Sequence, residues 1–157
     1  MSLLNEQIIN DVEILIRAEP HWLPSLANIA SLLFARMPDI NWAGFYLLKG
    51  NELILGPFQG QVACVRIGIG KGVCGTAFLE RRSLVVPDVH QFPGHIACDP
   101  RSRSEIVVPL IKGERTLGVL DIDSASYSRF TEDDQKLLET IASLITANYR
   151  LEDFVDC

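Results

Sequence analysis

The sequence predicts an α+β fold, with helices from both ends of the chain packed on one face of a central antiparallel sheet of about six strands. Near both termini, apolar residues recur every three or four positions, which is typical of amphipathic helices. Between these regions, short apolar segments alternate with turn residues, which is typical of strands joined by hairpins. The 157 residues are 48% hydrophobic, enough for one domain. We expect that domain to span residues 1–157, with its core at about 22–153.

Three long helices are expected. The first covers residues 3–17, where Leu4, Ile8, Val12 and Leu15 form an apolar stripe. The second follows Pro20 and runs to about residue 37, where Pro38 and Asp39 provide a stop signal. The last begins after Thr131, and Asp134 three positions later resembles a capping box.

The expected strands lie between these helices. Residues 42–48 and 52–58 flank Lys-Gly-Asn and form a predicted hairpin, and residues 62–68 form a third strand. The glycine-rich segment 68–82 opens into a short helix, and residues 83–89 form another strand. Residues 105–111 and 116–123 form a second hairpin, in which Pro109 indicates an edge or a bulge.

Composition restricts the partners and the compartment. A net charge of −6 argues against nucleic acid or an anionic membrane surface, because both require clustered cations. The sequence shows neither a secretion signal nor an apolar run long enough to cross a bilayer, so we expect a cytoplasmic protein. The four cysteines are then expected to be reduced at rest, and their spacing fits no Cys-x-x-Cys zinc pattern.

The long segment 87–104 has neither helical nor strand periodicity, and loops of this length in compact domains usually build a site. It contains Cys98, which has His95, Arg101 and Arg103 close in sequence. Cationic neighbours lower the pKa of a thiol and favour the reactive thiolate. The alternative is that Cys98 is a small buried residue that packs the loop against the core.

The same loop offers His90 and His95 as metal ligands beside Cys98. Their irregular spacing does not resemble that of known metal sites, so no metal is expected here.

Two further cysteines lie on neighbouring predicted elements. A thiol that is oxidised during turnover needs such a partner to form a disulfide, and Cys64 or Cys74 could provide it. Cys74 is expected near a helix N-terminus, which stabilises thiolates, but it could equally pack in the core. Cys64 follows the alternation of a strand and could face the core.

A group of acids and aromatic residues completes the candidate site. Asp121 and Asp123 point to the same face of a strand, and Glu105 opens the strand predicted beside it. In a pocket they could hold an ammonium group or donate a proton, whereas at solvated strand ends they would do neither. Trp42 and Tyr46 share a strand face, as an apolar wall or as ordinary core.

Several segments resemble the free methionine-R-sulfoxide reductases, which are built on a GAF domain: NWAGFYLL, LGPFQGQVACVRI, GKGVCGTA, VVPDVHQFPGHIACD, SRSEIVVPL and GVLDIDS. The resemblance implies a single GAF domain, often a homodimer, that reduces free methionine-R-sulfoxide. It implies that Cys98 is the nucleophile and that Cys64 or Cys74 resolves its sulfenic acid, with Cys64 slightly favoured. It further implies no bound cofactor, thioredoxin as the external reductant, and substrate binding by Trp42, Tyr46, Glu105, Asp121 and Asp123.

Two other readings remain open. A GAF-type sensor would bind a small molecule or register oxidant without turnover, but three cysteines and an acid cluster exceed what binding needs. A peroxide-reducing thiol protein would use Cys98 but leave the acids and Trp42 unexplained. Cys157 matches no motif and receives no role.

Overall fold

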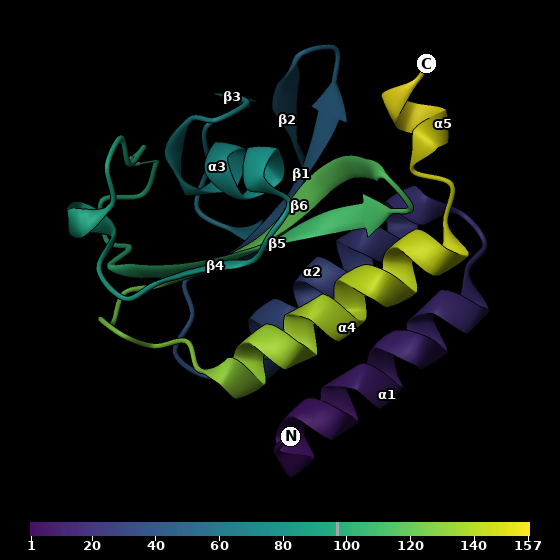
Figure 1. Cartoon of the computed structure of the whole chain (residues 1–157). Coiled ribbons are helices and arrows are strands. Elements are labelled where there is room, and N and C mark those ends of the chain that lie inside the picture. The colour runs from purple at the N-terminus through teal and green to yellow at the C-terminus, as the bar shows by residue number, and fades with distance from the viewer. Residues whose placement is uncertain (97) are drawn as a thin grey trace.

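The computed structural model describes residues 1–96 and 98–157 and contains one six-stranded sheet (Figure 1). The spatial order is β3-β2-β1-β6-β5-β4, and every neighbouring pair is antiparallel. The strands are β1 (Trp42–Lys49), β2 (Glu52–Gly60), β3 (Arg66–Gly68), β4 (Leu84–Val86), β5 (Ser104–Lys112) and β6 (Arg115–Ser124). The predicted α+β architecture is confirmed.

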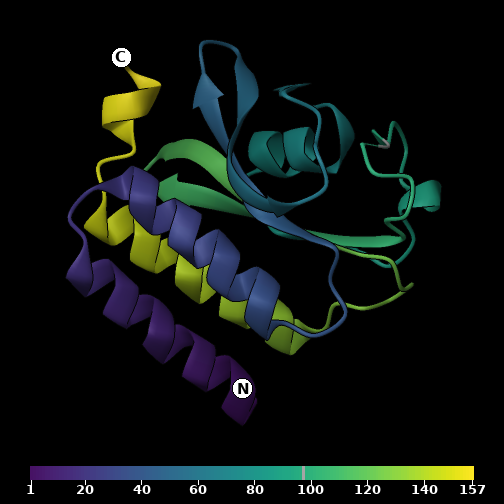
Figure 2. The ribbon, with the colours of Figure 1, turned by 180° about the vertical axis from the view of Figure 1, so that it is seen from behind.

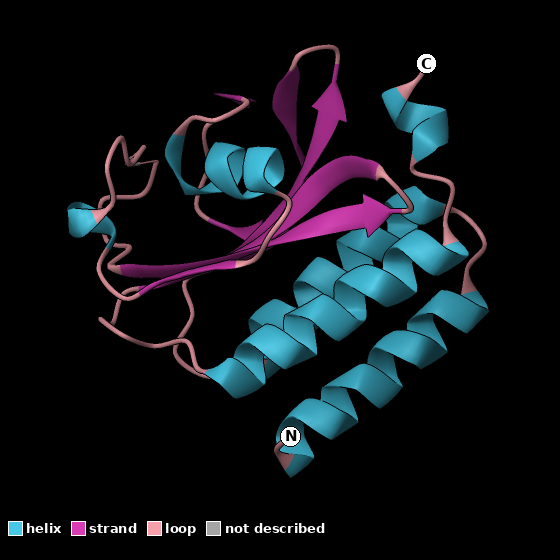
Figure 3. Cartoon of the chain, in the orientation of Figure 1, coloured by secondary structure: helices cyan, strands magenta, loops and turns pink. Residues whose placement is uncertain are grey.

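Three long helices form a layer on one face of this sheet (Figure 3). They are α1 (Leu3–Ala18), α2 (Trp22–Arg36) and α4 (Glu132–Asn148). The helices α2 and α4 pack on the strands, whereas α1 packs on these two helices and lies farthest from the sheet (Figure 2). Thr131 and Asp134 form the expected capping box at the start of α4. None of the helices in the described part of the chain is long and apolar enough to span a membrane.

The opposite face of the sheet carries α3 (Gly72–Glu80) and long connections, including the short 3-10 helix Val89–Gln91. The sheet therefore separates two apolar clusters. The larger fills the space between the sheet and the helical layer, and the smaller lies beneath α3 and contains Trp42, Tyr46 and Cys74.

A final short helix, α5 (Glu152–Val155), was not anticipated from the sequence. Cationic side chains from the tips of both hairpins hold it in place. The Lys49 ammonium donates to the carbonyl oxygens of Phe154 and Cys157, and Arg115 donates two hydrogen bonds of 2.9 Å to Asp156.

Both predicted hairpins are confirmed. Pro109 lies where β5 has a partner strand on one side only, because Val107 is the last residue of β5 that pairs with β4. The strand predicted from Val62 is wrong over its first half, because β3 begins only at Arg66. Cys64 lies in the preceding loop, where its carbonyl accepts a 2.8 Å hydrogen bond from the Tyr46 hydroxyl instead of pairing in a ladder.

Candidate active site

A pocket opens on the α3 face of the sheet, where the ends of β1, β5 and β6 meet α3 and the connections before β3 and β5. Seven of the eight residues predicted for the site line it: Trp42, Tyr46, Cys74, Cys98, Glu105, Asp121 and Asp123. The eighth, Cys64, is bonded to Cys98. The structure thus brings together these eight residues from six separate segments of the chain.

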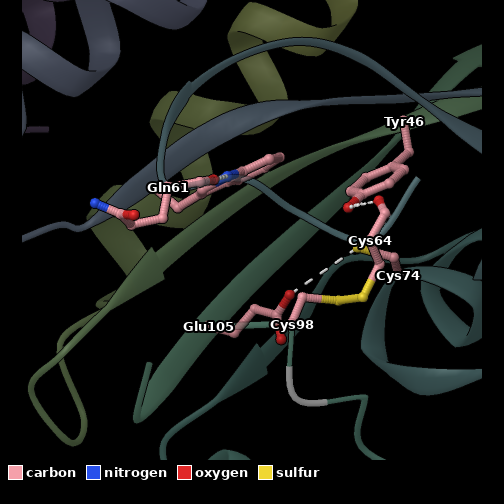
Figure 4. The surroundings of a disulfide bond; sticks show 7 residues. Tyr46, Gln61, Cys64, Cys74, Cys98 and Glu105 are labelled. Carbon is pink, nitrogen blue, oxygen red and sulfur yellow. Dashed lines mark hydrogen bonds between the residues drawn. A yellow bond between two sulfur atoms is a disulfide. The ribbon is translucent and has the colours of Figure 1, made fainter. Parts of the chain in front are cut away.

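Cys64 and Cys98 form a disulfide at the mouth of this pocket (Figure 4). Their Cα atoms are 5.5 Å apart although 34 positions separate them in the chain. Both residues are partly exposed, so this pair remains accessible to another thiol. Between the two cysteines proposed as partners of Cys98, the structure pairs it with Cys64.

The loop that carries Cys98 is attached to the start of β1 by polar contacts. Asn41 donates from its side-chain amide to Asp99 at 3.2 Å and to the Ser102 hydroxyl at 3.1 Å. Asp99 also accepts hydrogen bonds from the backbone and guanidinium of Arg101. These contacts lower the pKa of Asp99, chiefly through Arg101, and keep it ionised.

Two of the three cations near Cys98 in sequence are engaged with other side chains. Arg101 is paired with Asp99, and the Arg103 guanidinium lies 5.2 Å from the centre of the Tyr127 ring. Only His95 of the three lines the pocket, and burial lowers its pKa, which favours the neutral ring. The expectation that both arginines activate Cys98 is therefore not supported by their positions.

Strand register brings the three acids together. Asp123 of β6 lies between Trp42 of β1 and Glu105 of β5, each directly across from it. Asp121, two residues earlier on β6, points to the same face. Glu105 and Asp121 are buried, whereas Asp123 is partly exposed toward the pocket.

This environment raises the pKa of all three carboxyl groups. Burial is the largest cause for each, because removal from water penalises the charged form. Repulsion between the carboxylates raises these pKa values further. The charge of Asp121 raises the pKa of Glu105, that of Asp123 raises the pKa of Asp121, and that of Glu105 raises the pKa of Asp123. The three groups titrate as one coupled cluster that retains protons to higher pH than isolated carboxyls do.

Cys74 lies in the first turn of α3, as expected, but it is not a thiolate site. Burial, followed by the nearby Asp121 and Glu105 charges, raises the pKa of the Cys74 thiol well above its usual value. These effects outweigh the lowering of the thiol pKa that a helix N-terminus produces. The Cys74 thiol lies 4.0 Å from a Glu105 carboxylate oxygen, to which it donates a weak hydrogen bond (Figure 4).

Aromatic rings form the wall opposite the acids. The Trp42 and Tyr46 rings are stacked with centroids 6.0 Å apart, and the Phe58 ring also stacks on Trp42. Gly44 makes this arrangement possible, because a Cβ atom there would lie 2.7 Å from the Trp42 ring and 2.4 Å from the Phe58 Cβ. Both sequence readings of Trp42 and Tyr46 therefore hold: they are buried and they line the pocket.

Sequence reasoning assigned no role to several other residues of the pocket. Lys71 and Val73 come from the start of α3, Ser102 from the loop before β5, and Ile96 lies against Gly72. The glycine-rich segment before α3 was a signal for this close approach, since Gly72 has a φ of +60° and a Cβ there would meet Ile96 at 3.1 Å. His90 and Cys157 do not line the pocket.

The fold and the pocket together define a class of protein. The chain belongs to the GAF domain family, whose model matches residues 24–148. Comparison with individual proteins narrows this assignment. The chain is 53% identical over 135 residues to the free methionine-R-sulfoxide reductase of Escherichia coli, covering 85% of this chain and 82% of that protein.

A second enzyme of the same description, from Saccharomyces cerevisiae, is 48% identical and aligns with 89% of this chain and 82% of its own length. A solved structure of the free methionine-R-sulfoxide reductase of Neisseria meningitidis in complex with its substrate superposes with a TM-score of 0.90 at 39% identity, covering 96% of this chain and 90% of that one. Among GAF proteins, the chain is therefore a member of the free methionine-R-sulfoxide reductase family.

Proposed function

We propose that this protein reduces free L-methionine-(R)-S-oxide to L-methionine, with Cys98 as the nucleophile. The observation that carries the proposal is the Cys64–Cys98 disulfide, which lies over a pocket with three acids on one side and stacked aromatic rings on the other. Such a pocket combines a redox-active thiol pair, a proton source and an apolar wall. Two family members that match most of the chain bear the name of this activity.

The reaction begins with the two cysteines reduced. The Cys98 thiolate attacks the sulfoxide sulfur, and the sulfoxide oxygen is transferred to Cys98, which releases methionine and leaves a sulfenic acid. The Cys64 thiol then attacks the Cys98 sulfur, the new S–S bond forms, and the oxygen leaves as water. Two electrons pass from the cysteine pair to methionine sulfoxide.

The acid cluster supplies the proton that this oxygen needs. Because burial and mutual repulsion raise the carboxyl pKa values, the cluster retains protons to higher pH than isolated carboxyl groups do and can act as a proton donor. Asp123 is the best placed to deliver it, since it is the most exposed of the three to the pocket.

The remaining parts of the substrate match the other walls. The methylthio end fits against the Trp42 and Tyr46 rings, since sulfur and methyl groups pack well on aromatic faces. An ionised acid of the cluster holds the ammonium group. We assign the substrate carboxylate to Lys71 and to the backbone N–H groups of the first turn of α3, where the described residues provide no side-chain cap.

Cys64 is the resolving cysteine in this scheme, and Cys74 acts instead as a neutral thiol beneath the acids. A disulfide that must be reduced after every turnover requires an external dithiol such as thioredoxin and a reducing compartment. We therefore also propose a cytoplasmic location and thioredoxin as the reductant. The resemblance to the family is the basis on which we propose a homodimeric assembly.

The test measures methionine formation from both sulfoxide epimers, free and peptide-bound, with a thioredoxin system. Activity should be confined to the free R form. Cys98→Ser should abolish it, whereas the control Cys157→Ser, which changes an exposed thiol outside the pocket, should leave it nearly unchanged. Full activity of Cys98→Ser would refute the mechanism, and ligand binding without turnover by the unaltered protein would favour a sensor.

A further inference from the structure

Beneath the disulfide, three potential metal ligands converge from three rigid elements. Cys74 belongs to α3, Glu105 to β5 and Asp121 to β6, and all three side chains are buried. The cysteine sulfur and one oxygen of each carboxylate lie within 4.8 Å of one another. Because helices and strands position the three backbone segments, rotation of the side chains has to close the remaining gaps between these atoms.

One of these donors has no partner. Asp121 is only 5% exposed, and its buried Oδ1 atom accepts no hydrogen bond in the described part of the chain. Among the same residues, no lysine, arginine or histidine forms an ion pair with Glu105 or Asp121. A buried carboxylate oxygen without a donor or counter-ion is costly, which indicates a place for a ligand with positive charge.

We propose that Cys74, Glu105 and Asp121 form a binding site for a divalent metal ion of the Zn²⁺ type. One sulfur and two carboxylate oxygens suit a borderline-soft ion such as Zn²⁺ better than Mg²⁺ or Ca²⁺, which take oxygen ligands only. Zn–S and Zn–O bonds of about 2.3 and 2.1 Å place tetrahedral donors roughly 3.5 Å apart. Cys74 Sγ and Glu105 Oε2 are 4.0 Å apart and need to approach by only a few tenths of an ångström.

The fourth ligand position faces the pocket, which Cys74, Glu105 and Asp121 all line. Water from the pocket can fill it. The ion would therefore occupy the acid cluster that is proposed to hold the substrate's ammonium group and to supply the proton, and zinc would compete with substrate. This inhibitory consequence depends on the proposed function, whereas metal binding itself does not.

The experiment uses tag-free protein oxidised so that Cys64 and Cys98 are joined and cannot act as ligands. Co²⁺ serves as the probe, because a bound cation displaces the proton of the otherwise neutral Cys74 thiol, and the resulting thiolate–Co²⁺ bond gives a charge-transfer band in the near ultraviolet. One equivalent should bind and produce this band, and Zn²⁺ should displace it. Absence of saturable one-to-one binding would overturn the proposal without any bearing on catalysis.

Variants identify the ligands. Cys157→Ser, which removes the other free thiol, should keep the band, and Cys74→Ser should lose it. Asp121→Asn keeps both thiols and the side-chain shape, and should weaken Co²⁺ binding by at least about tenfold. A band that survives Cys74→Ser, or unchanged affinity in Asp121→Asn, would contradict the site. If circular dichroism shows that Cys74→Ser does not fold, the Co²⁺ affinity of Asp121→Asn alone tests the site.

In the reduced protein, Zn²⁺ should raise the apparent KM for methionine sulfoxide without lowering kcat. Inhibition that extra substrate does not relieve would contradict binding at this site. The cobalt titration stands by itself if the protein reduces no sulfoxide.

Discussion

Asp121 illustrates how a single buried carboxyl group is maintained. It is directly opposite Gly44, whose missing side chain leaves space for the Trp42 ring, and opposite apolar Val107 on the other neighbouring strand. Water therefore has little access to it, and the neighbouring acids add repulsion. Under the proposed function, this destabilising group is kept because the acid cluster to which it belongs supplies a proton.

This arrangement predicts a pH-dependent stability. A carboxyl group whose folded-state pKa is raised binds protons more tightly in the folded protein, so the free energy of unfolding falls as pH rises from the unfolded pKa to the folded one. Asp121→Asn removes this loss, by about 1.4 kcal/mol for each unit by which the pKa is raised. Urea unfolding of the oxidised protein should show a larger gain at pH 8 than at pH 5.

Asp153→Asn changes an exposed carboxylate of α5 and is the matched control, with little effect at either pH. A gain for Asp121→Asn that is equal at both pH values would contradict the raised pKa.

Seven of the residues predicted from the sequence line the pocket. For two of them, Asp121 and Asp123, strand periodicity alone predicts that they share one face of the sheet. It could not choose between Cys64 and Cys74 as the partner of Cys98. That pairing depends on how two loops approach each other, which no local pattern encodes. The positions of Arg101 and Arg103 were missed for the same reason: proximity in sequence does not determine which group a long side chain contacts.

Among the elements, the loop before β5 determines where Cys98 lies. Its described residues have little regular structure beyond the 3-10 helix Val89–Gln91, and Asn41 and Arg101 both donate hydrogen bonds to Asp99. The neighbouring Cys98 is thereby fixed relative to β1. Catalysis is sensitive to such placement, since an error of about 1 Å can cost roughly a hundredfold in rate.

Asp99→Ala should therefore slow formation of the Cys64–Cys98 disulfide by about tenfold or more after one equivalent of sulfoxide is added to reduced protein. Thiol counting in quenched samples measures the rate. Asp88→Ala is the control, because Asp88 caps the 3-10 helix of the same loop and does not line the pocket. Equal slowing by both variants would indicate general loosening of the loop instead of a role for Asp99.

Elements with strong periodicity were predicted well, and those with weak periodicity were not. The stripes of α1, α2 and α4 continue for several turns, and each helix lies within two residues of its expected limits where these were given. The segment 62–68 alternates like a strand, but Glu52–Ile54 of β2 pair with only its last three residues. Alternation indicates that a segment can be a strand, whereas a partner determines whether it is one.

Across the whole molecule, the sheet separates the larger hydrophobic core from the pocket. The larger apolar cluster lies between the sheet and the helices, and all the pocket residues lie on the other side. The two faces can therefore change independently.

Leu138→Ala tests this separation. Leu138 is fully buried in the larger cluster, so its truncation should lower the free energy of unfolding by about 2 to 5 kcal/mol. At a temperature where the variant remains folded, KM and kcat for methionine sulfoxide should be unchanged. Altered KM with intact folding would show that the helical layer influences the pocket.

The overall fold was accessible from the sequence because periodicity defines which face of each element is apolar. The short α5 was not, since its position depends on Lys49 and Arg115 at hairpin tips far away in the chain.

The disulfide also makes a covalent ring. The two cysteines are 34 positions apart in sequence, and the ring encloses β3, α3, β4 and most of the loop before β5. In the chain-entropy treatment, a ring of this size disfavours the unfolded chain by about 4 kcal/mol. During every catalytic cycle the molecule would alternate between the disulfide-bonded form and the reduced form, and the reduced form would be less resistant to heat and proteases. When reductant is scarce, the protein would remain in the disulfide-bonded form, which is inactive but resists unfolding. When reductant is ample, the protein would be reduced and active, and proteases would degrade it more easily.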